Sequence, residues 1–324
     1  MHSNPTEKKT GQATQGPTIT VVTACFNQAH TLEKTIKSVL EQDYKNVEYI
    51  IMDGGSSDTS LDIIGRYRDR LAHVTSGADK GQYHAINQGL RMGTGEIMAW
   101  LNGDDIYFPW TLQVVADIFT QYPEIDWIVG LPSYLDPQGV LCEVSNRHPA
   151  YCSSEIAQGC YCDPLFGYIQ QESMFWRRRV WESAGGLDTK YQYAADFELW
   201  TRFAVHAPLV AVALPLAAFR MDPTRQRSRV FQQQYYGEVD ALFELKAGWG
   251  ARSLRWVCKR SEAVKLMVRF FAIAPTPIIA KSIKDPRFYH YMHTWSNRMR
   301  KSFFGIILEF STRKKIKSSL QGEA

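Results

Sequence analysis

The sequence lacks a run of apolar residues long enough to cross a membrane. The best candidate lies in the last quarter of the chain, where Lys265 and Arg269 interrupt it and Pro275 and Pro277 break it. It also has no internal repeat, and no secretory signal at its start. We therefore expect a chain that does not span a bilayer and that works in the cytoplasm.

Cysteine is scarce and scattered. The six cysteines do not suggest a disulfide framework, and we expect a reducing compartment. A cluster of Cys152, Cys160 and Cys162 with His148 invites a zinc site, but its spacing fits none of the usual ligand patterns, so we do not expect one.

The composition is that of a folded protein with a sizeable core. Of the 324 residues 45% are apolar, 22% are charged and only 14 are proline, which excludes a fibre or a wholly disordered chain. Residues 1–17 are polar and rich in Gly, Thr and Gln, and they are expected to form a disordered leader. The length fits one large domain with an appendage.

Charge is unevenly distributed. Residues 1–250 carry 21 basic and 29 acidic side chains, whereas residues 251–324 carry 16 basic and 4 acidic ones, interleaved with aromatics. Such a basic segment suits amphipathic helices on an anionic membrane surface. The alternative is that the aromatics pack on the main domain and the charges are solvated. We do not expect nucleic acid as a partner.

Strand and helix patterns alternate over the first 130 residues. Continuous apolar runs predict buried strands, and residues recurring at helical spacing predict helices between them, one beginning with a capping box at Thr59 and Asp62. This order predicts an α/β fold with a doubly wound, mostly parallel sheet. Strands are predicted at 19–24, 47–52, 73–76, 97–101, 125–129 and 209–214, and helices at 32–42, 85–91, 109–121, 177–184, 195–206 and 231–245.

Acidic residues lie at one end of three of these elements. Asp53 ends the second strand, Asp104 and Asp105 end the fourth, and Asp196 opens a later helix. Each has a plain structural reading, as a turn residue or a helix N-cap. Together, however, the strand-end carboxylates offer hard oxygen ligands for Mg²⁺ or Mn²⁺, the counter-charge that a bound diphosphate needs.

Five segments make the chain resemble the inverting nucleotide-sugar transferases of glycosyltransferase family 2, which have a Rossmann-like type A fold. They run in family order between residues 18 and 220: ITVVTACFN (19–27), YIIMDGGSSD (49–58), DKGQYHAINQG (79–89), GEIMAWLNGDD (95–105) and AADFELW (194–200). Where many relatives carry an Arg followed by a His, this chain has Arg220 near Asp222, so Arg220, Arg225 or Arg227 is left as the source of positive charge.

The resemblance implies a role for each matching residue. Asp196 would be the catalytic base and Asp105 the ligand of the metal. The nucleotide sugar would be bound by Phe26, Asp53, Lys80 and Asp104. The resemblance also implies a domain of residues 18–245, with a nucleotide-sugar half at 18–130 and an acceptor half at 131–245, followed by a basic, aromatic-rich helical tail at 246–324.

The expected function is a metal-dependent, inverting transfer of sugar from a nucleotide-diphosphate sugar, taken as a UDP-sugar, to a glycan or lipid-linked acceptor. It would serve cell-surface polysaccharide or glycolipid synthesis at the inner face of the cytoplasmic membrane. Two alternatives stay open. A nucleotidyltransferase would need a Gly-rich loop where Cys25, Phe26, Asn27 and Gln28 stand, and a non-catalytic relative would have no use for the carboxylates.

Overall fold

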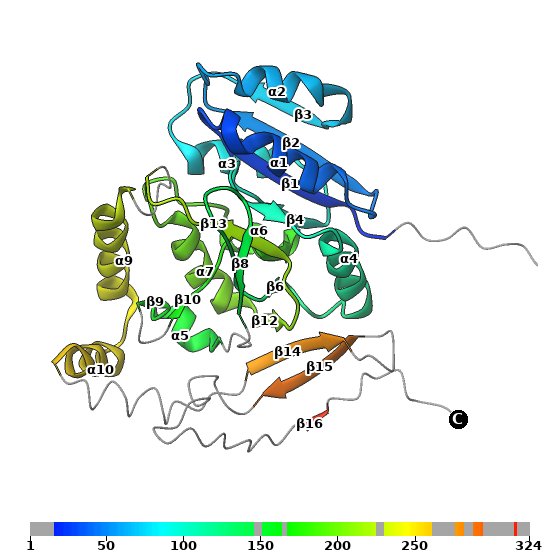
Figure 1. The fold of residues 1–324 in the computed structure, drawn as a ribbon. Coiled ribbons are helices and arrows are strands. Elements are labelled where there is room, and N and C mark those ends of the chain that lie inside the picture. Colours follow the sequence, from blue (N-terminus) through cyan, green and yellow to red (C-terminus); the bar gives the residue numbers. More distant parts are fainter. Residues whose placement is uncertain are drawn as a thin grey trace, which may run out of the picture.

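A computed structural model gives the fold of the chain (Figure 1). It describes residues 16–145, 151–163, 167–224, 230–260, 276–281, 288–293 and 314–315. Most of the predicted leader lies outside these ranges. Its last two residues do not, since the carbonyls of Gly16 and Pro17 accept hydrogen bonds from Asn46 and Tyr44.

The first half is a run of parallel strands joined by helices, as the sequence predicts. The helices are amphipathic: α1 buries Leu32, Ile36 and Val39 against the sheet. The elements are β1 (Ile19–Cys25), α1 (Ala29–Leu40), β2 (Val47–Asp53), α2 (Ser60–Arg66), the 3₁₀ turn η1 (Arg68–Arg70), β3 (His73–Ser76), α3 (Gln82–Met92), β4 (Ile97–Trp100), β5 (Ile106–Tyr107), α4 (Thr111–Gln121) and β6 (Trp127–Val129).

The second half adds short strands and longer helices. Its elements are β7 (Ser133–Leu135), β8 (Leu141–Val144), α5 (Ser153–Ala157), β9 (Cys162–Asp163), β10 (Gly167–Tyr168), β11 (Met174–Arg177), α6 (Arg178–Ala184), α7 (Ala195–His206), β12 (Leu209–Val212), β13 (Ala217–Arg220) and α9 (Gln232–Lys246). Helix α7 has the predicted bounds, and β7 and β8 form the hairpin that the turn at Gly139 suggests.

One mixed sheet joins the two halves. Its order is β16-β15-β14-β12-β6-β11-β4-β1-β2-β3, and β4, β1, β2 and β3 are parallel. Strand β11, from the second half, is antiparallel to both β4 and β6. It therefore lies in the centre of the sheet, between two strands of the first half. The segment before β11 therefore lies beside the end of β4. A smaller sheet, in the order β5-β13-β7-β8, stands next to it.

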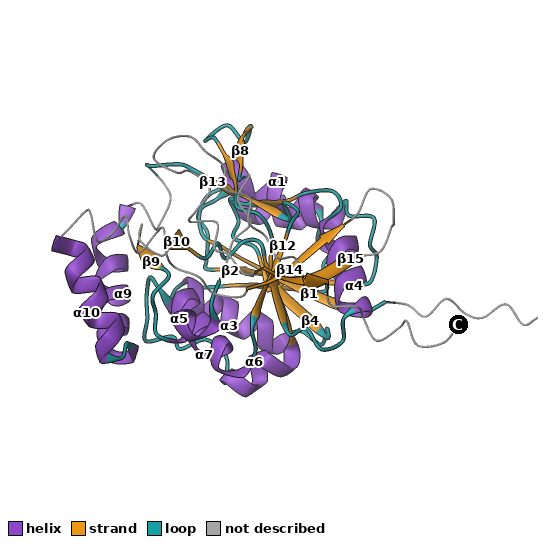
Figure 2. Cartoon of the chain, turned by 90° about the horizontal axis from the view of Figure 1, so that it is seen from below, coloured by secondary structure: helices purple, strands orange, loops and turns teal. Residues whose placement is uncertain are grey.

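Helices cover both faces of the main sheet (Figure 2). Strand β1 is buried along its whole length because its side chains alternate between two cores. Ile19 and Val21 pack with α1, α2 and α4, whereas Val22 and Ala24 pack with α3, α6 and α7. This double burial explains why the strand reads as an unbroken apolar run, and it confirms the doubly wound α/β fold.

The second core is rich in tryptophan. Trp100 stacks on Trp200 with ring centroids 5.6 Å apart, and Trp176 meets both rings edge-on. Beside them, Arg177 is buried, forms an ion pair with Glu96 and donates to the carbonyl of Ile125. Trp176 and Arg177 therefore belong to the core.

The described part of the tail holds one helix and three short strands, and most of the tail lies outside the described residues, so the helical tail stays a prediction. The described elements are α10 (Trp249–Arg260) and the strands β14 (Thr276–Lys281), β15 (Phe288–His293) and β16 (Lys314–Lys315), which lie beyond β12 (Figure 1). Runs of β-branched and aromatic residues in β14 and β15 favour strands. Over the described ranges, every helix is too short or too polar to cross a bilayer.

Candidate functional site

The carboxyl ends of β1, β2 and β4 lie next to one another, and the loops that leave them carry most of the predicted site. In parallel sheets this edge is where ligands bind, because the loops diverge there and leave a crevice. The parallel register pairs Cys25 of β1 with Asp53 of β2, and Val22 of β1 with Trp100 of β4. Asp53 and the loop that holds Asp104 and Asp105 are therefore on the same side of the sheet.

Asp53 is buried at the end of β2 and organises the turn that follows it. Its Oδ2 accepts hydrogen bonds from the Gly55 and Ser56 amides (3.1 Å each) and from the Ser76 hydroxyl (2.7 Å), while Oδ1 accepts from the Ser56 hydroxyl. Burial by itself raises the pKa of this carboxyl, but the hydrogen bonds from Ser56, Ser76 and Gly55 outweigh it and hold the pKa below its usual range.

Asn27 fastens the loop after β1 to the same turn. It is a non-glycine residue with positive φ, 52°, a conformation that asparagine tolerates better than most residues. Its Oδ1 accepts from the amide of Ser57 at 2.8 Å, and its own amide donates to the Ser56 hydroxyl at 2.9 Å. The two loops are therefore held as one rigid unit.

Phe26 lies between these loops with its ring in the open. It is 60% exposed, although it is a large apolar side chain. A Cβ on Gly54 would lie 3.5 Å from the Phe26 ring and 3.2 Å from Asp79 Oδ2, so only glycine leaves the space between them free. Lys80, the next residue, is exposed on the loop before α3. A flat aromatic face next to carboxylates suits a nucleobase.

The loop from Asn102 to Asp105 is held from both sides. From α1, the hydroxyls of Thr31 and Thr35 donate to the carbonyls of Gly103 (2.8 Å) and Asp105 (2.7 Å). Asn102 accepts from Gln82 Nε2 at the start of α3 and donates to Gln171 Oε1, just before β11. The loop geometry is therefore fixed by residues from three distant parts of the chain.

The two aspartates of this loop have different environments. Asp105 is only 1% exposed, and its Oδ1 accepts from the Arg220 amide at 2.9 Å while Oδ2 accepts from Asn102 at 3.3 Å. Asp104 is half-buried. Burial raises the pKa of both carboxyls, for Asp105 well above the usual value with a further contribution from Asp104 and Glu172.

Arg220 braces this loop with its guanidinium. Its Nε donates to the carbonyl of Asp104 at 2.8 Å and Nη1 to that of Pro137 at 3.2 Å. Arg220 is buried, and its positive charge partly offsets the effect of burial on the pKa of Asp104. Arg225 and Arg227, the other two arginines considered from the sequence, lie outside the described residues.

Asp196 lies at the start of α7, half-buried, with its orientation set by Tyr83. The phenol of Tyr83 lies 3.0 Å from Asp196 Oδ1 and 2.9 Å from the carbonyl of Tyr193. Burial raises the pKa of Asp196, although the hydrogen bond from Tyr83 opposes this. Glu198, two residues further along α7, is paired with Arg202 at 2.5 Å.

The turn before α7 is clamped by α9. The carboxylate of Glu238 accepts the backbone amides of Gln192 (2.7 Å), Tyr193 (2.8 Å) and Ala194 (2.8 Å). These amides lie just before the helix and at its N-cap, and an acidic group at this end also interacts favourably with the helix dipole. Helix α9 thereby keeps Asp196 in place.

Glu172 lies near this site, although the sequence prediction does not name it among the site residues. It is 2% exposed, and burial together with the charges of Asp104 and Asp196 raises the pKa of its carboxyl to about 8. The carboxyl is therefore close enough to both aspartates to be influenced by their charges. The signal in the sequence was only a Glu next to a predicted irregular segment, with no motif around it.

Over the described ranges, no three His, Cys, Asp or Glu side chains converge closely enough to hold a metal ion by themselves. The acidic character of the site nevertheless fits a cation. Asp104 and Glu172 raise the pKa of Asp105, and Asp104 raises that of Glu172. Mg²⁺ in proteins is commonly held by one or two carboxylates together with substrate phosphates. Of the residues considered for zinc, Cys160 is buried, and Cys152 Sγ shares a hydrogen bond with the hydroxyl of Ser154 at 3.1 Å. His148 lies outside the described residues.

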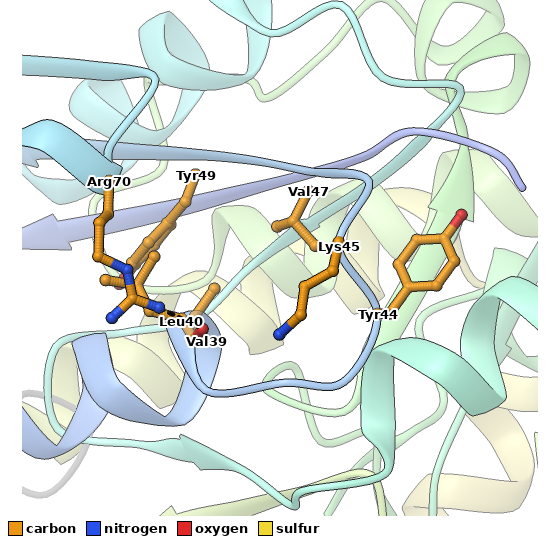
Figure 3. Close-up of a pocket in the computed structure, with 7 residues that line it drawn as sticks. All are labelled: Val39, Leu40, Tyr44, Lys45, Val47, Tyr49 and Arg70. Atoms are coloured by element: carbon orange, nitrogen blue, oxygen red, sulfur yellow. Dashed lines mark hydrogen bonds between the residues drawn. The ribbon is translucent and has the colours of Figure 1, made fainter. Parts of the chain in front are cut away.

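A cavity of about 170 Å³ lies elsewhere (Figure 3). It is lined by the start of β2, at Val47 and Tyr49, and by the end of α1, at the edge of the sheet opposite Asp53. Both basic side chains that line it already make hydrogen bonds within the protein. Lys45 donates to the carbonyl of Gln42 and Arg70 donates to that of Leu40, both at 2.7 Å. It contains no acidic side chain, and the carboxylate cluster is the better candidate site.

Comparison with known proteins places this site in a family. The family model described as Glycosyl transferase family 2 matches residues 20–182, just over half of the chain, including the loops with Phe26, Asp53, Asp104 and Glu172. The chain belongs to glycosyl transferase family 2. This confirms the resemblance drawn from the five segments, four of which lie within the matched range.

Curated relatives in family 2 cover parts of the chain. An uncharacterized glycosyltransferase of Nostoc sp. is 34% identical over 122 residues, 36% of each chain, and one of Rickettsia typhi is 26% identical over 192 residues, 59% of this chain and 60% of that protein. The chain therefore spans between about a third and three fifths of the length of these relatives.

Solved structures share the fold. Residues 1–349 of Staphylococcus aureus TarS, in a crystal structure with UDP-GlcNAc, superpose with a TM-score of 0.54 at 16% identity, covering 70% of this chain and 66% of that one. This agreement confirms the type A fold predicted from the sequence.

Proposed function

We propose that this family 2 member is an inverting glycosyltransferase that moves a sugar from a nucleotide-diphosphate sugar to a hydroxyl of a glycan or lipid-linked acceptor. The observation that carries the proposal is at the start of α3, where Gln82 donates to Asn102 in the loop of Asp104 and Asp105 and the next residue, Tyr83, lies 3.0 Å from Asp196 Oδ1. The strand-end carboxylates and the helix-start carboxylate are thus near one another, which supports a site where a donor and an acceptor meet.

In this proposal Asp196 is the catalytic base. Its carboxylate takes the proton of the acceptor hydroxyl while that oxygen forms a bond to the anomeric carbon of the sugar. The bond from this carbon to the diphosphate oxygen breaks on the opposite face, and its electron pair leaves with the nucleoside diphosphate. One displacement inverts the configuration, so no covalent enzyme intermediate is needed.

The donor binds along the carboxyl edge of β1, β2 and β4. Phe26 stacks on the base, and Asp53 supports the base site by accepting a hydrogen bond from the base and by holding the turn below it. Lys80 and Asp104 contact the ribose and diphosphate. TarS, which shares the fold, has been crystallised with UDP-GlcNAc, and this makes UDP-sugars the first donors to test.

Asp105, with Asp104 beside it, would hold Mg²⁺ or Mn²⁺ together with the diphosphate. Such an ion neutralises the charge that develops on the departing nucleoside diphosphate. The chain itself contributes a rigid loop, in which Thr31, Thr35 and Asn102 fix the positions of both aspartates before any ligand arrives.

We further propose that residues 18–130 bind the nucleotide sugar, that residues 131–245 bind the acceptor, and that residues 246–324 place the enzyme on an anionic, cytoplasmic membrane surface. Support for the last point comes from α10, where Trp249 is 85% and Trp256 58% exposed. A membrane-bound acceptor would lead to cell-surface polysaccharide or glycolipid.

The test is release of UDP from UDP-glucose, UDP-galactose and UDP-GlcNAc with Mn²⁺, in the presence of a membrane extract as acceptor. Asp196→Asn should reduce transfer by about 10²-fold to 10⁴-fold, because the amide cannot take a proton, and it should leave UDP affinity nearly unchanged. Turnover by the variant at the wild-type rate would contradict the assignment. Tight UDP binding with no turnover in the wild type would favour a non-catalytic relative.

A further inference from the structure

Three neighbouring side chains before β11 contain buried polar atoms without a hydrogen bond. These are Gln170 Oε1, Glu172 Oε1 and Ser173 Oγ, and within the described residues none of them meets a donor or acceptor. By contrast, Gln171, in the middle of the group, makes hydrogen bonds through both Oε1 and Nε2. Buried polar atoms are nearly always paired in folded proteins, so a group of unpaired atoms next to a proposed active site indicates a ligand that pairs them.

Of the three, Glu172 is the residue for which a missing hydrogen-bond partner costs most. It is 98% buried, it can be charged, and Oε1 has no partner among the described residues. The environment disfavours its charge, since Asp104 and Asp196 are both acidic. The buried Oε1 therefore carries a cost that no described hydrogen bond at that atom offsets.

The backbone around Glu172 is nevertheless firmly held. Gln171 donates from Nε2 to the carbonyl of Trp100 at 2.7 Å and accepts from Asn102 at 3.0 Å. On the other side, the carbonyl of Ser173 accepts from the amide of Gly130, and β11 begins at the next residue. The Glu172 carboxyl is therefore presented from a fixed backbone at the end of β4.

We propose that Glu172 binds the sugar being transferred, with Oε1 accepting a hydrogen bond from one of its hydroxyl groups. This rests on the proposed glycosyl transfer. In that reaction the sugar must lie between the diphosphate, next to Asp104, and the acceptor hydroxyl, next to Asp196. Glu172 follows Gln171, which accepts a hydrogen bond from Asn102 in the loop of Asp104, and the charge of Asp196 also reaches its carboxyl. The residue would thereby help to select the donor sugar.

Other ligands fit this position less well. A phosphate group at Oε1 would add negative charge where burial, Asp104 and Asp196 already disfavour it. A metal held by protein alone is not supported, because no three acidic or metal-binding side chains converge over the described ranges. The nucleobase has its own place beside Phe26, at the ends of β1 and β2. A sugar hydroxyl is an uncharged donor, and it can meet Oε1 without adding negative charge.

The test compares affinities for UDP and for the UDP-sugar that the wild-type full-length protein turns over fastest among UDP-glucose, UDP-galactose and UDP-GlcNAc. Titration calorimetry with Mn²⁺ is run on the wild type, Glu172→Gln and Glu172→Ala. Glu182→Gln, an exposed glutamate on α6, is the matched control.

Glu172→Ala should weaken binding of the UDP-sugar at least tenfold. It should leave the dissociation constant of UDP within twofold of the wild-type value, because UDP lacks the sugar. Glu172→Gln keeps an acceptor oxygen and should lose less. It should also melt at the wild-type temperature or above, since a carboxyl with a pKa of about 8 is largely uncharged at neutral pH and the amide is uncharged as well. The control should match the wild type throughout.

Equal loss for UDP and the UDP-sugar, or no loss for either, would overturn the proposal, as would a Glu172→Gln variant that melts well below the wild type. Absence of UDP binding by the wild type would refute the glycosyltransferase assignment itself, and the role of Glu172 would fall with it. The UDP measurement on the wild type therefore separates the two failures.

Discussion

The phenol of Tyr83 and the carboxylate of Asp196 lie 3.0 Å apart, although 113 residues separate them in the chain. Tyr83 opens α3 directly after the loop that carries Lys80, and Asp196 opens α7. The hydrogen bond therefore links the nucleotide side of the site to the acceptor side. It also stabilises the ionised form of Asp196, because a donor favours the charged carboxylate.

Removing this hydrogen bond should change the pH dependence of catalysis. Burial raises the pKa of Asp196 and Tyr83 counteracts this, so Tyr83→Phe should raise the pKa further. A base works only when ionised, and the acidic limb of the pH profile of kcat should therefore move to higher pH. On that acidic limb, where the ionised fraction of Asp196 limits the rate, we expect a loss of about tenfold, the size of one hydrogen bond to a charged group.

The measurement is kcat against pH for the wild type and Tyr83→Phe, with Tyr67→Phe as control. Tyr67 also donates to a carboxylate, that of Glu33, at 2.8 Å, but it lies at the end of α2. A profile that is lowered evenly, with no movement of the acidic limb, would show that Tyr83 acts on folding alone.

Metal dependence should be concentrated at Asp105. Asp105→Asn keeps an acceptor for the amide of Arg220, so the loop should stay folded, but it removes the charge. We expect Mn²⁺ to strengthen UDP binding by the wild type and to have at least tenfold less effect on the variant. Titration of UDP with Mn²⁺ and with EDTA measures this, with the exposed Asp43→Asn as control. An unchanged Mn²⁺ effect would leave Asp105 as a purely structural residue.

Much of the fold could be predicted because its signals are local. The unbroken apolar run of β1 reflects burial on both faces, and the stripe of Leu32, Ile36 and Val39 marks α1. Strand β11 was missed, since it is four residues long and α6 follows without a break. Thr59 makes no capping hydrogen bond, so the predicted capping box is wrong. Asp58 instead accepts the amide of Ser60 at 2.9 Å.

The site was predictable only in part, for a related reason. Asp53, Asp104 and Asp105 follow strands, and parallel topology brings strand ends together. Glu172 reaches the same place only because β11 enters the sheet antiparallel beside β4, which no local pattern announces. Likewise, the clamp of Glu238 on the turn before Asp196 depends on how α9 packs.

The turn after β2 should make the protein sensitive to acid. The pKa of Asp53 is held low in the fold, so its ionised form contributes stability above the pKa of the unfolded chain, and this contribution is lost as pH falls through the lower, folded value. Asp53→Asn should cost about 2 kcal/mol at pH 7, in the range for hydrogen bonds to a charged group, and much less near pH 3.

Urea unfolding of the wild type and Asp53→Asn between pH 3 and pH 7 measures this difference, with Asp43→Asn as the exposed control. A difference in the free energy of unfolding that stays constant over this range would show that the charge of Asp53 is irrelevant, and that only its shape matters.

Helix α10 presents a surface that suits a membrane interface. Trp249 and Trp256 are exposed and seven residues apart, which places them on one side of the helix. Arg260 lies over the Trp256 ring at 3.9 Å. Helix α10 contacts α9 through Arg255, which pairs with Asp240 at 2.5 Å and lies over the Phe243 ring. The helix is thus fixed to the enzyme while its tryptophans face outward.

Replacing both tryptophans by serine should therefore weaken binding of the full chain to vesicles. Tryptophan favours the headgroup region, and each Lys or Arg near anionic lipid adds roughly 1 kcal/mol, so binding should be stronger to anionic than to neutral vesicles and should fall at high salt. In co-sedimentation, the variant Trp249→Ser/Trp256→Ser should lose most of the binding that survives high salt, because that part comes from the aromatic rings. Val205→Ser, which removes an exposed apolar side chain from α7, should bind like the wild type. If the double variant also binds like the wild type, α10 does not touch the membrane, and the exposed tryptophans serve another contact.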